Sequence, residues 1–349
     1  MSEITKVALD AMGGDNAPKA IIQGAIDVVA KRQDIHIFLV GQEKVVEEEL
    51  KKYEYPKEQI SIVNATEVIE TAEPPVMAIR RKKDSSIVVA MNMVKNGEAD
   101  AFVSAGSSGA ILVGGQVLVG RIKGVERPPL APLIPTQKGV SLLIDCGANV
   151  DARPEWLCQF ARMGSLYMEK VMGVKNPVVK LVNLGLEDEK GNAFIKSVKP
   201  MIEAIPDINY QGYIESREIP YGGADVIVTD AWTGNAMLKL YEGTGSVLIS
   251  TIKSTLMSGF ITKIGALLIM PKLKKELKRF DASEYGGAPL LGLKGLIVKC
   301  HGNAKAKEIC NAIMQCESFV NAGINEVLTE YLDKDMKAVS EAVKPAETV

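Results

Sequence analysis

The sequence predicts an α/β fold with a largely parallel sheet. Short apolar runs alternate along the chain with longer amphipathic stretches, and this order favours strands joined by helices. Right-handed crossovers then place helices on both faces of the sheet. No repeat of fixed period is present that would indicate a solenoid.

The expected elements follow from hydrophobic periodicity, taken from the N-terminus onward. The predicted strands are residues 6–10, 36–40, 60–64, 101–104, 141–145, 178–184, 210–214, 226–229 and 295–300. The predicted helices are residues 19–32, 85–96, 110–120, 154–173 and 305–322. Segment 127–139 contains four prolines and cannot be regular throughout, which suits a subdomain junction, a cleft wall or a surface loop. We expect residues 1–330 to form one domain and the polar residues 331–349 to form a frayed tail.

Composition narrows the class of protein. The 349 residues are 47% apolar and 24% charged, as in ordinary soluble globular proteins, and the net charge of -2 gives no electrostatic argument for binding nucleic acid. The five cysteines form no CxxC pair, which indicates reduced thiols in a cytosolic chain. The N-terminus lacks the features of a secretion signal, and no apolar run reaches the roughly 18 residues of a spanning helix.

The first predicted strand runs into a glycine-rich loop, DAMGGDNAP, at residues 10–18. Gly13 and Gly14 precede Asp15 and Asn16, and Asn16 is the expected N-cap of the helix that follows. Exposed backbone N–H groups at such a helix start suit a phosphate or a carboxylate. A well-capped tight turn without a ligand is the alternative.

A second loop, SAGSSGA at residues 104–110, follows another predicted strand. Ser107, Ser108 and Gly109 combine hydroxyls with backbone donors at a helix start, which suits an oxyanion. The loop is neither GxxxxGK[ST] nor GxGxxG, so no nucleotide cofactor is expected. Small residues that allow close packing of helix on strand are the alternative.

Three aspartates occupy the same place in three strand–helix units: Asp10, Asp145 and Asp230. Asn149 and Asn235 follow the second and third of them. One such aspartate is usually a helix cap, whereas three at one sheet edge are more typical of a ligand site. Nothing in their spacing specifies a metal, and none is predicted.

A third ligand-type segment, EYGGAPLLGLKG at residues 284–295, is followed by KCHGN at residues 299–303. Gly286 and Gly287 indicate backbone that turns sharply or approaches something closely. His301 is expected at the carboxyl end of a strand, where it acts in proton transfer or only holds the loop. Cys146 is the one cysteine placed like a nucleophile, and its neighbour Asp145 argues for a structural role.

An apolar helical hairpin is predicted at residues 245–280, broken at Gly259 and again at Pro271, with a basic helix after the proline. Its apolar run is too short to span a bilayer. Flanking lysines fit insertion at an anionic membrane surface, and a dimer interface or a core helix pair is the alternative. The basic run RRKK at residues 80–83 is either a solvated face or a docking point for an acidic partner.

Together, these loops resemble the bacterial phosphate acyltransferases of phospholipid synthesis. The carrying motifs are DAMGGDNAP, SAGSSGA, the loop 145–149, VTDAWTGN at 228–235, and EYGGAPLLGLKG with HGN, which cover residues 10–303 in the family's order. The sequence departs from the family's pattern at Ser107–Ser108 and at Ala231–Trp232, where the family more often has asparagine-threonine and glycine-phenylalanine.

The resemblance implies transfer of a long-chain acyl group from an acyl carrier protein thioester to inorganic phosphate, without a cofactor. It implies a Rossmann-like α/β/α sandwich similar to phosphotransacetylases and isocitrate-dehydrogenase-type enzymes, with a protruding helical hairpin. It further implies a cytoplasmic homodimer that associates peripherally with the inner face of the cell membrane through residues 245–280. A membrane glycerol-phosphate acyltransferase then uses the product. A short-chain phosphotransacetylase acting on acyl-coenzyme A is the alternative.

The candidate site residues follow from these motifs. His301, Asn235 and Asp230 are the candidate catalytic residues, while Asp10, Asp145 and Asp230 are also suited to position loops. Phosphate can attack a thioester directly, so an activated cysteine is not required. The candidate substrate-binding and phosphate-binding residues are Gly13, Gly14, Asp15, Asn16, Ser107, Ser108, Gly109, Asp145, Asn149, Gly286 and Gly287.

Overall fold

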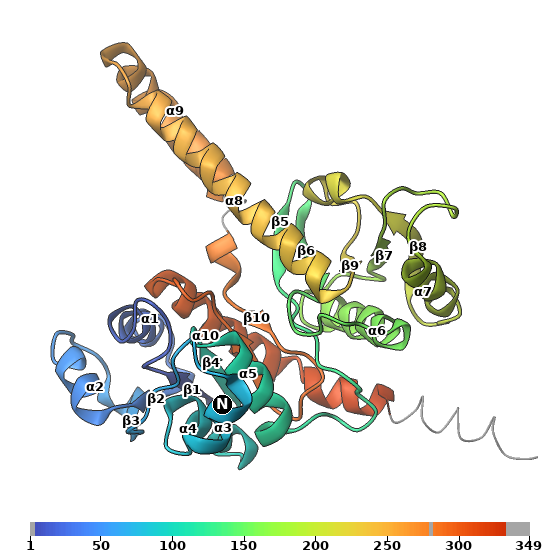
Figure 1. Ribbon diagram of the computed structural model, residues 1–349. Helices are drawn as coiled ribbons and strands as arrows, with labels where there is room; N and C mark the ends of the chain where they lie inside the picture. Colours follow the sequence, from blue (N-terminus) through green and yellow to red (C-terminus); the bar gives the residue numbers. More distant parts are fainter. Residues whose placement is uncertain (1–3, 279–281, 333–349) are drawn as a thin grey trace, which may run out of the picture. The chain divides into compact units, whose positions relative to one another are not determined.

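The computed structural model describes residues 4–278 and 282–332, which form two compact units, each with its own sheet (Figure 1). Unit 1 contains the chain up to Leu130, the segment Glu169–Val174 and the chain from Gly286 onward. Unit 2 contains Ala131–Met168 and Lys175–Tyr285. The predicted α/β fold with largely parallel strands is confirmed, and the strands divide between two sheets.

The sheet of unit 1 has the strand order β10-β11-β4-β1-β2-β3, and only β10 is antiparallel to its neighbour. The chain steps outward from β1 through β2 to β3, and β4 then returns to the other side of β1. The topological switch point of this sheet therefore lies between β1 and β4, where ligands of such sheets bind. The strands are β1 (Thr5–Asp10), β2 (Ile35–Gly41), β3 (Ile60–Asn64), β4 (Ala101–Ser104), β10 (Ala288–Pro289) and β11 (Leu296–Lys299).

Helices cover both faces of this sheet (Figure 1). On one face α1 (Lys19–Val29) packs against α10 (Ala306–Asn321), so closely that a Cβ on Gly24 would lie 2.7 Å from Cβ of Ile309. On the other face lie α4 and α5. Besides α1 and α10, the helical segments of unit 1 are α2 (Glu43–Leu50), η1 (Lys57–Gln59), α3 (Pro75–Arg81), α4 (Ser86–Lys95), α5 (Ser108–Gly114) and its π-helical continuation η2 (Gly115–Val119).

The sheet of unit 2 has the order β5-β6-β9-β7-β8, and all pairs except β5–β6 are parallel. Ile134, Leu143, Ile214 and Ile227 are among the buried residues of its core. Its strands are β5 (Leu133–Thr136), β6 (Gly139–Ile144), β7 (Val178–Val182), β8 (Asn209–Ile214) and β9 (Val226–Val228). Its helical segments are α6 (Pro154–Lys170), α7 (Ala193–Glu203), η3 (Ser216–Tyr221), α8 (Ala231–Leu256), α9 (Phe260–Lys278) and η4 (Ala282–Tyr285).

Every strand predicted from the sequence is present, with ends that differ by at most two residues. Two further strands, β5 and β10, were not predicted. β5 lies inside the four-proline segment, and Pro135 is tolerated there because β5 is an edge strand. The boundary between the two units, after Leu130, falls in the same segment. All but the first two residues of the predicted tail lie outside the described residues.

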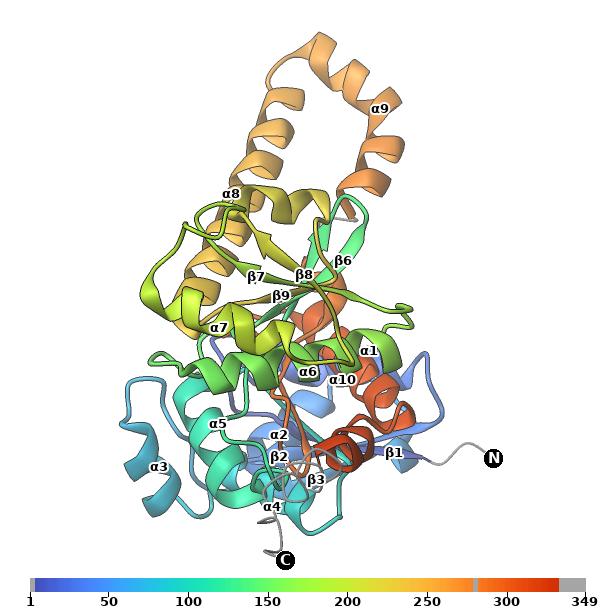
Figure 2. The ribbon, with the colours of Figure 1, turned by 90° about the vertical axis from the view of Figure 1, so that its right-hand side faces the viewer.

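The predicted hairpin is present, with different limits. Helix α8 already begins at Ala231, and α9 lies beside it, both extending beyond the strands of unit 2 (Figure 2). The predicted break at Gly259 is confirmed, because this residue lies between α8 and α9. The predicted end at Pro271 is wrong: α9 continues through it. Leu267, whose carbonyl the proline leaves without an intrahelical donor, is 78% exposed, so water can solvate that group.

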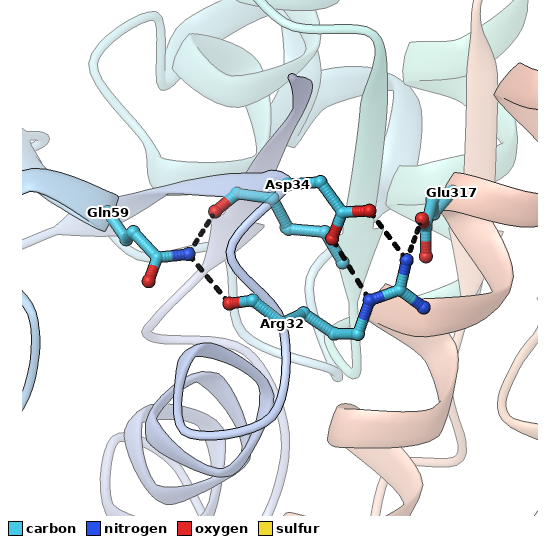
Figure 3. A network of polar contacts seen from close by, with 5 residues as sticks. Arg32, Asp34, Gln59 and Glu317 are labelled. Atoms are coloured by element: carbon cyan, nitrogen blue, oxygen red, sulfur yellow. Dashed lines mark hydrogen bonds and ion pairs between the residues drawn. The ribbon is translucent and has the colours of Figure 1, made fainter. Parts of the chain in front are cut away.

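An ion-pair network around Arg32 joins three elements of unit 1 (Figure 3). Nη2 of Arg32 lies 2.7 Å from Oδ2 of Asp34, just before β2, and also pairs with Glu317 of α10. Nε2 of Gln59 donates to the backbone carbonyl of Arg32 at 2.9 Å. The network thus fixes the turn between α1 and β2 against α10.

We predict that Arg32→Met destabilises unit 1 by about 1 kcal/mol, near the upper end for partly exposed ion pairs. Because the Arg32 guanidinium lowers the pKa of Asp34 from 3.8 to about 2, this contribution is present above pH 3.8 and is lost as the pH falls toward 2. The free energy of unfolding in urea, measured for the wild type and the variant at pH 7 and at pH 3, tests this prediction. Arg80→Met, at an exposed arginine, is the control. A difference between wild type and Arg32→Met that does not shrink in acid contradicts the prediction.

Candidate active site

Asp10 lies at the topological switch point of unit 1 and is fully buried. Its Oδ2 accepts a hydrogen bond of 2.6 Å from the hydroxyl of Ser104, the last residue of the neighbouring strand β4. Its Oδ1 accepts from the backbone N–H of Met12 at 3.1 Å, and Ser86 and Gly13 donate to the carboxyl as well. Burial raises the pKa of Asp10, while these hydrogen bonds lower it. Asp10 therefore ties its own loop to β4 and α4, which supports the predicted positioning role.

The two glycines of the first loop allow three chain segments to meet. A Cβ on Gly13 would lie 2.2 Å from Oδ2 of Asp10 and 2.8 Å from the backbone nitrogen of Gly106. Gly14 has φ of 101°, and a Cβ there would lie 2.9 Å from the carbonyl oxygen of Gly302. Only glycine fits at these positions, so the loop after β1 touches those after β4 and β11.

The loop after β1 is bonded to the loop after β11. The backbone N–H of Asp15 donates to the carbonyl of Gly302 at 2.8 Å. Nδ2 of Asn16 donates to the carbonyls of Asn303 at 2.9 Å and Ala304 at 3.2 Å. The predicted N-cap role of Asn16 is wrong: Pro18 holds the N-cap position of α1, and the amide of Asn16 is used between loops.

The second predicted loop forms the start of α5. Ser107 is buried and caps the helix, with its hydroxyl accepting from the backbone N–H of Ala110 at 3.4 Å. Ser108 and Gly109 occupy the first turn, where backbone N–H groups have no intrahelical acceptor. A Cβ on Gly109 would lie 2.5 Å from Cγ of Pro75, so glycine here also allows α3 to approach. Gly106, which lies against Gly13, comes two residues before Ser108, so the start of α5 follows directly after the contact with the Gly13–Gly14 turn.

His301 follows β11 and is exposed. Its Nδ1 accepts a hydrogen bond of 3.4 Å from the backbone N–H of Asn303. With Nδ1 as acceptor, a neutral ring carries its proton on Nε2, which is then a donor. The neutral, exposed ring can therefore donate a hydrogen bond from Nε2 while the backbone holds its orientation.

Unit 2 contains a second set of predicted residues, at the ends of the adjacent strands β6 and β9. The carboxylate of Asp145 accepts from the backbone N–H groups of Ala148 at 3.2 Å and Asn149 at 2.9 Å. Nδ2 of Asn149 donates to the same carboxylate at 2.7 Å. The backbone N–H of Asp145 donates to the carbonyl of Thr229 at 3.0 Å. Asp145 thus closes its own loop, as Asp10 does in unit 1.

Asp230 caps α8 and brings Asn235 to the same loop. Its carboxylate accepts from the backbone N–H of Thr233 at 2.9 Å and from the hydroxyl of Thr233 at 2.7 Å. These bonds support its positioning role. A Cβ on Gly147 would lie 3.7 Å from Oδ1 of Asn235, so the amide of Asn235 lies beside the loop after β6. Asp145, Asn149, Asp230 and Asn235 are therefore neighbours within unit 2.

Gly286 and Gly287 pack against α10. A Cβ on Gly286 would lie 2.9 Å from the backbone of Ala312, and the N–H of Gly287 donates to Oε1 of Gln315 at 3.1 Å. A Cβ on Gly287 would lie 2.9 Å from the carbonyl oxygen of Lys299. These contacts explain the glycines by close packing, and a role in binding substrate stays a prediction.

The cysteines of both units are protonated at neutral pH. Burial raises the pKa of Cys300 to about 12 and that of Cys158 to about 11. Burial, with the Asp145 charge, also raises the pKa of Cys146 well above its usual range. Since the thiolate is the nucleophilic form, these thiols are not activated. Among the described residues, no group of three or more His, Cys, Asp or Glu side chains is arranged to hold a metal ion.

One charged residue of this region was missed in the sequence. Lys299 ends β11, and its ammonium interacts electrostatically with Asp10 and Asp15. Desolvation by burial lowers the pKa of Lys299. The available signal was a lysine as the last residue of an otherwise apolar strand, directly before the histidine loop.

Comparisons with known proteins agree with the resemblance in the motifs. A family model described as "Fatty acid synthesis protein" matches residues 5–327. A phosphate acyltransferase of Alkaliphilus oremlandii is 49% identical over 93% of this chain and 96% of its own length. One of Clostridium beijerinckii is 48% identical over 91% of this chain and 96% of its own length.

Solved structures support the fold. A phosphotransacetylase from Streptococcus pyogenes matches with a TM-score of 0.58 at 16% identity, over 90% of this chain and 94% of that chain. A branched-chain phosphotransacylase from Enterococcus faecalis V583 matches with a TM-score of 0.55 at 12% identity, over 90% of this chain and 99% of that chain. The chain therefore belongs to the fatty acid synthesis protein family, in which its curated relatives are named phosphate acyltransferase, and it is an enzyme of the transferase class.

Proposed function

We propose that this enzyme transfers a long-chain acyl group from an acyl carrier protein thioester to inorganic phosphate. A phosphate oxygen attacks the thioester carbon, a C–O bond forms and the C–S bond breaks. The products are acyl phosphate and the carrier thiol, and the proton that the attacking hydrogen phosphate loses balances the one that the thiol gains. The observation that carries the proposal is the set of glycine-rich loops held by Asp10 at the switch point of unit 1. The names of the curated relatives support phosphate as acceptor.

The loops of unit 1 supply what an attacking phosphate needs. Gly13 and Gly14 lie against Gly106 and Ala105, just before the α5 start with Ser108 and Gly109, while Asn16 is bonded to the loop after β11. Backbone N–H groups of such loops are suited to bind an anion without a bulky side chain. Binding in fixed loops converts the attack into a step within one complex, which lowers the entropic part of the barrier.

An amide and an imidazole are suited to the other charges of the reaction. The side chain of Asn235 is a candidate donor to the oxyanion that develops on the thioester oxygen. His301 follows β11 and is exposed, and its protonated ring, in which both nitrogens are donors, is a candidate donor of the proton that the leaving thiolate takes up. Because the buried cysteines are protonated, the proposed scheme includes no attack by an enzyme thiol.

The acyl donor is tested by mixing the enzyme with phosphate and either palmitoyl-acyl carrier protein or acetyl-coenzyme A, then measuring acyl phosphate. We expect product with the palmitoyl donor and at least about tenfold less with the acetyl donor, since one lost methylene in an apolar site alone costs about 1 kcal/mol. Equal or better turnover of acetyl-coenzyme A favours a short-chain phosphotransacetylase, whose fold this chain shares.

We predict that His301→Ala lowers acyl phosphate formation by about 10²-fold, the usual loss when a general acid is removed. His36→Gln is the matched control, because His36 lies in β2 with Nε2 3.0 Å from Oγ of Ser61. Initial rates at saturating phosphate, with melting temperatures, separate chemistry from folding. An unchanged rate in His301→Ala removes His301 from the mechanism.

We also propose that the hairpin binds the inner face of the cell membrane, where the enzyme acts as a cytoplasmic peripheral protein and homodimer. No helix in the described part of the chain is long and apolar enough to cross a bilayer. Apolar side chains of α9 are nevertheless strongly exposed, among them Phe260 at 80%, Ile261 at 83%, Leu267 at 78% and Leu268 at 80%. Lys263, Lys272 and Lys274 of the same helix are exposed cations that suit anionic headgroups.

Membrane contact would suit the chemistry of the product. A long-chain acyl phosphate is poorly soluble in water, and we propose that a membrane glycerol-phosphate acyltransferase consumes it. The N-terminal part of α8 is anchored in unit 2, where the hydroxyl of Tyr241 donates to the backbone carbonyl of Pro135 at 2.6 Å. Most of α8 beyond Tyr241 and most of α9 remain exposed and available for contact.

We predict that the double variant Leu267→Asp, Leu268→Asp abolishes cosedimentation with vesicles of anionic lipid. The added charges oppose burial in the interface, while turnover of a soluble short-chain donor is unchanged. Exchanging the exposed Lys95 and Glu98, outside the hairpin, gives a charge-neutral control. Wild-type protein that fails to sediment with vesicles contradicts membrane binding by the hairpin. A variant that loses its dimer mass in solution assigns the hairpin to subunit contact.

A further inference from the structure

Lys299 is a charged residue of the unit 1 loops that the proposed function leaves without a role. It ends β11 and lies in register with Ser104 of β4, whose hydroxyl donates to Asp10. Its ammonium interacts electrostatically with Asp10 and with Asp15. Lys299 therefore lies among the loops that follow β1, β4 and β11.

Most of the hydrogen-bonding capacity of this ammonium is unused. Nζ of Lys299 donates to the carbonyl of Cys300, and no second hydrogen bond or ion pair of Nζ occurs within residues 4–278 and 282–332. An ammonium carries three N–H donors, so two remain. Partial burial disfavours the charged form and lowers the pKa of Lys299. Lys299 is half-buried, so its two spare donors are available to a ligand.

The two nearby carboxylates do not account for the lysine. Asp10 already accepts hydrogen bonds from Ser104, Met12, Ser86 and Gly13. Asp15 is exposed, so water solvates its carboxylate.

The loop that carries Asp15 extends over the end of β11. The backbone N–H of Asp15 donates to Gly302, and a Cβ on Gly302 would lie 3.8 Å from Oδ2 of Asp15. The glycine-rich loop that is the candidate anion site thus contacts the loop directly after β11, and Lys299 is the last residue of that strand.

We propose that Lys299 binds the attacking phosphate and supplies the positive charge beside its oxygens. This inference rests on the proposed function, which makes phosphate a substrate. A lysine suits the task because its ammonium is a compact charge with rotatable donors. Its charge also offsets the repulsion of Asp10 and Asp15 against an incoming phosphate dianion.

Two variants separate this role from a structural one. Lys299→Met removes both the charge and the donor to Cys300, whereas Lys299→Gln removes the charge and keeps an N–H that can reach that carbonyl. Both should raise KM for phosphate by about 10- to 100-fold, the effect of a lost hydrogen bond to a charged group, with KM for the acyl donor within about twofold. Lys294→Met is the control, since Lys294 is an exposed lysine before the same strand.

Phosphate binding is measured independently of turnover, from the rise in melting temperature with inorganic phosphate alone. The wild type and Lys294→Met should be stabilised, and both Lys299 variants should lose that stabilisation. Restored binding in Lys299→Gln, or an unchanged KM for phosphate in either variant, overturns the inference. If Lys299→Met does not fold, the phosphate KM and the melting temperature of Lys299→Gln decide whether Lys299 binds phosphate. A wild type that binds phosphate but forms no acyl phosphate refutes the proposed function and leaves the binding test valid.

Discussion

The hydrogen bond between Ser104 and the buried carboxylate of Asp10 is the contact on which the unit 1 loops depend. A buried carboxylate is costly unless donors surround it, and here the donors come from β4, from α4 and from the loop after β1. Satisfying Asp10 therefore fixes the switch point and the turn at Gly13. Gly14 then lets the loop after β11 approach the loop after β1. His301 lies in that loop, and Lys299 is the last residue of β11 before it.

Unit 2 has the same arrangement of an aspartate at a strand end, with other residues. Asp145 closes the loop after β6, and Asp230 caps α8 after the adjacent strand β9. In each case an aspartate at a strand end accepts backbone N–H groups from the residues that follow, so the loop is rigid before any ligand binds. Rigid donors stabilise developing charge without rearrangement during the reaction.

Much of this could be predicted from the sequence, because strand periodicity and aspartates at strand ends are local signals. The fold class and the partners of Asp145 and Asp230 within their own loops follow from such signals. What could not be predicted depends on segments far apart in the chain: the amide of Asn16 bonds to the carbonyl of Asn303, and the ammonium of Lys299 interacts electrostatically with Asp15. The strand at Leu133–Thr136 was not predicted because it contains Pro135, which only an edge strand tolerates.

We propose that phosphate held by these loops attacks the thioester directly, without an acylated enzyme. The protonated, buried Cys146 and Cys300 agree with it. The most direct measurement mixes the enzyme with excess palmitoyl-acyl carrier protein in the absence of phosphate, then follows carrier thiol release and the intact mass of the enzyme. We expect no thiol burst and no added acyl mass until phosphate is supplied. A stoichiometric burst with a palmitoylated enzyme would contradict it.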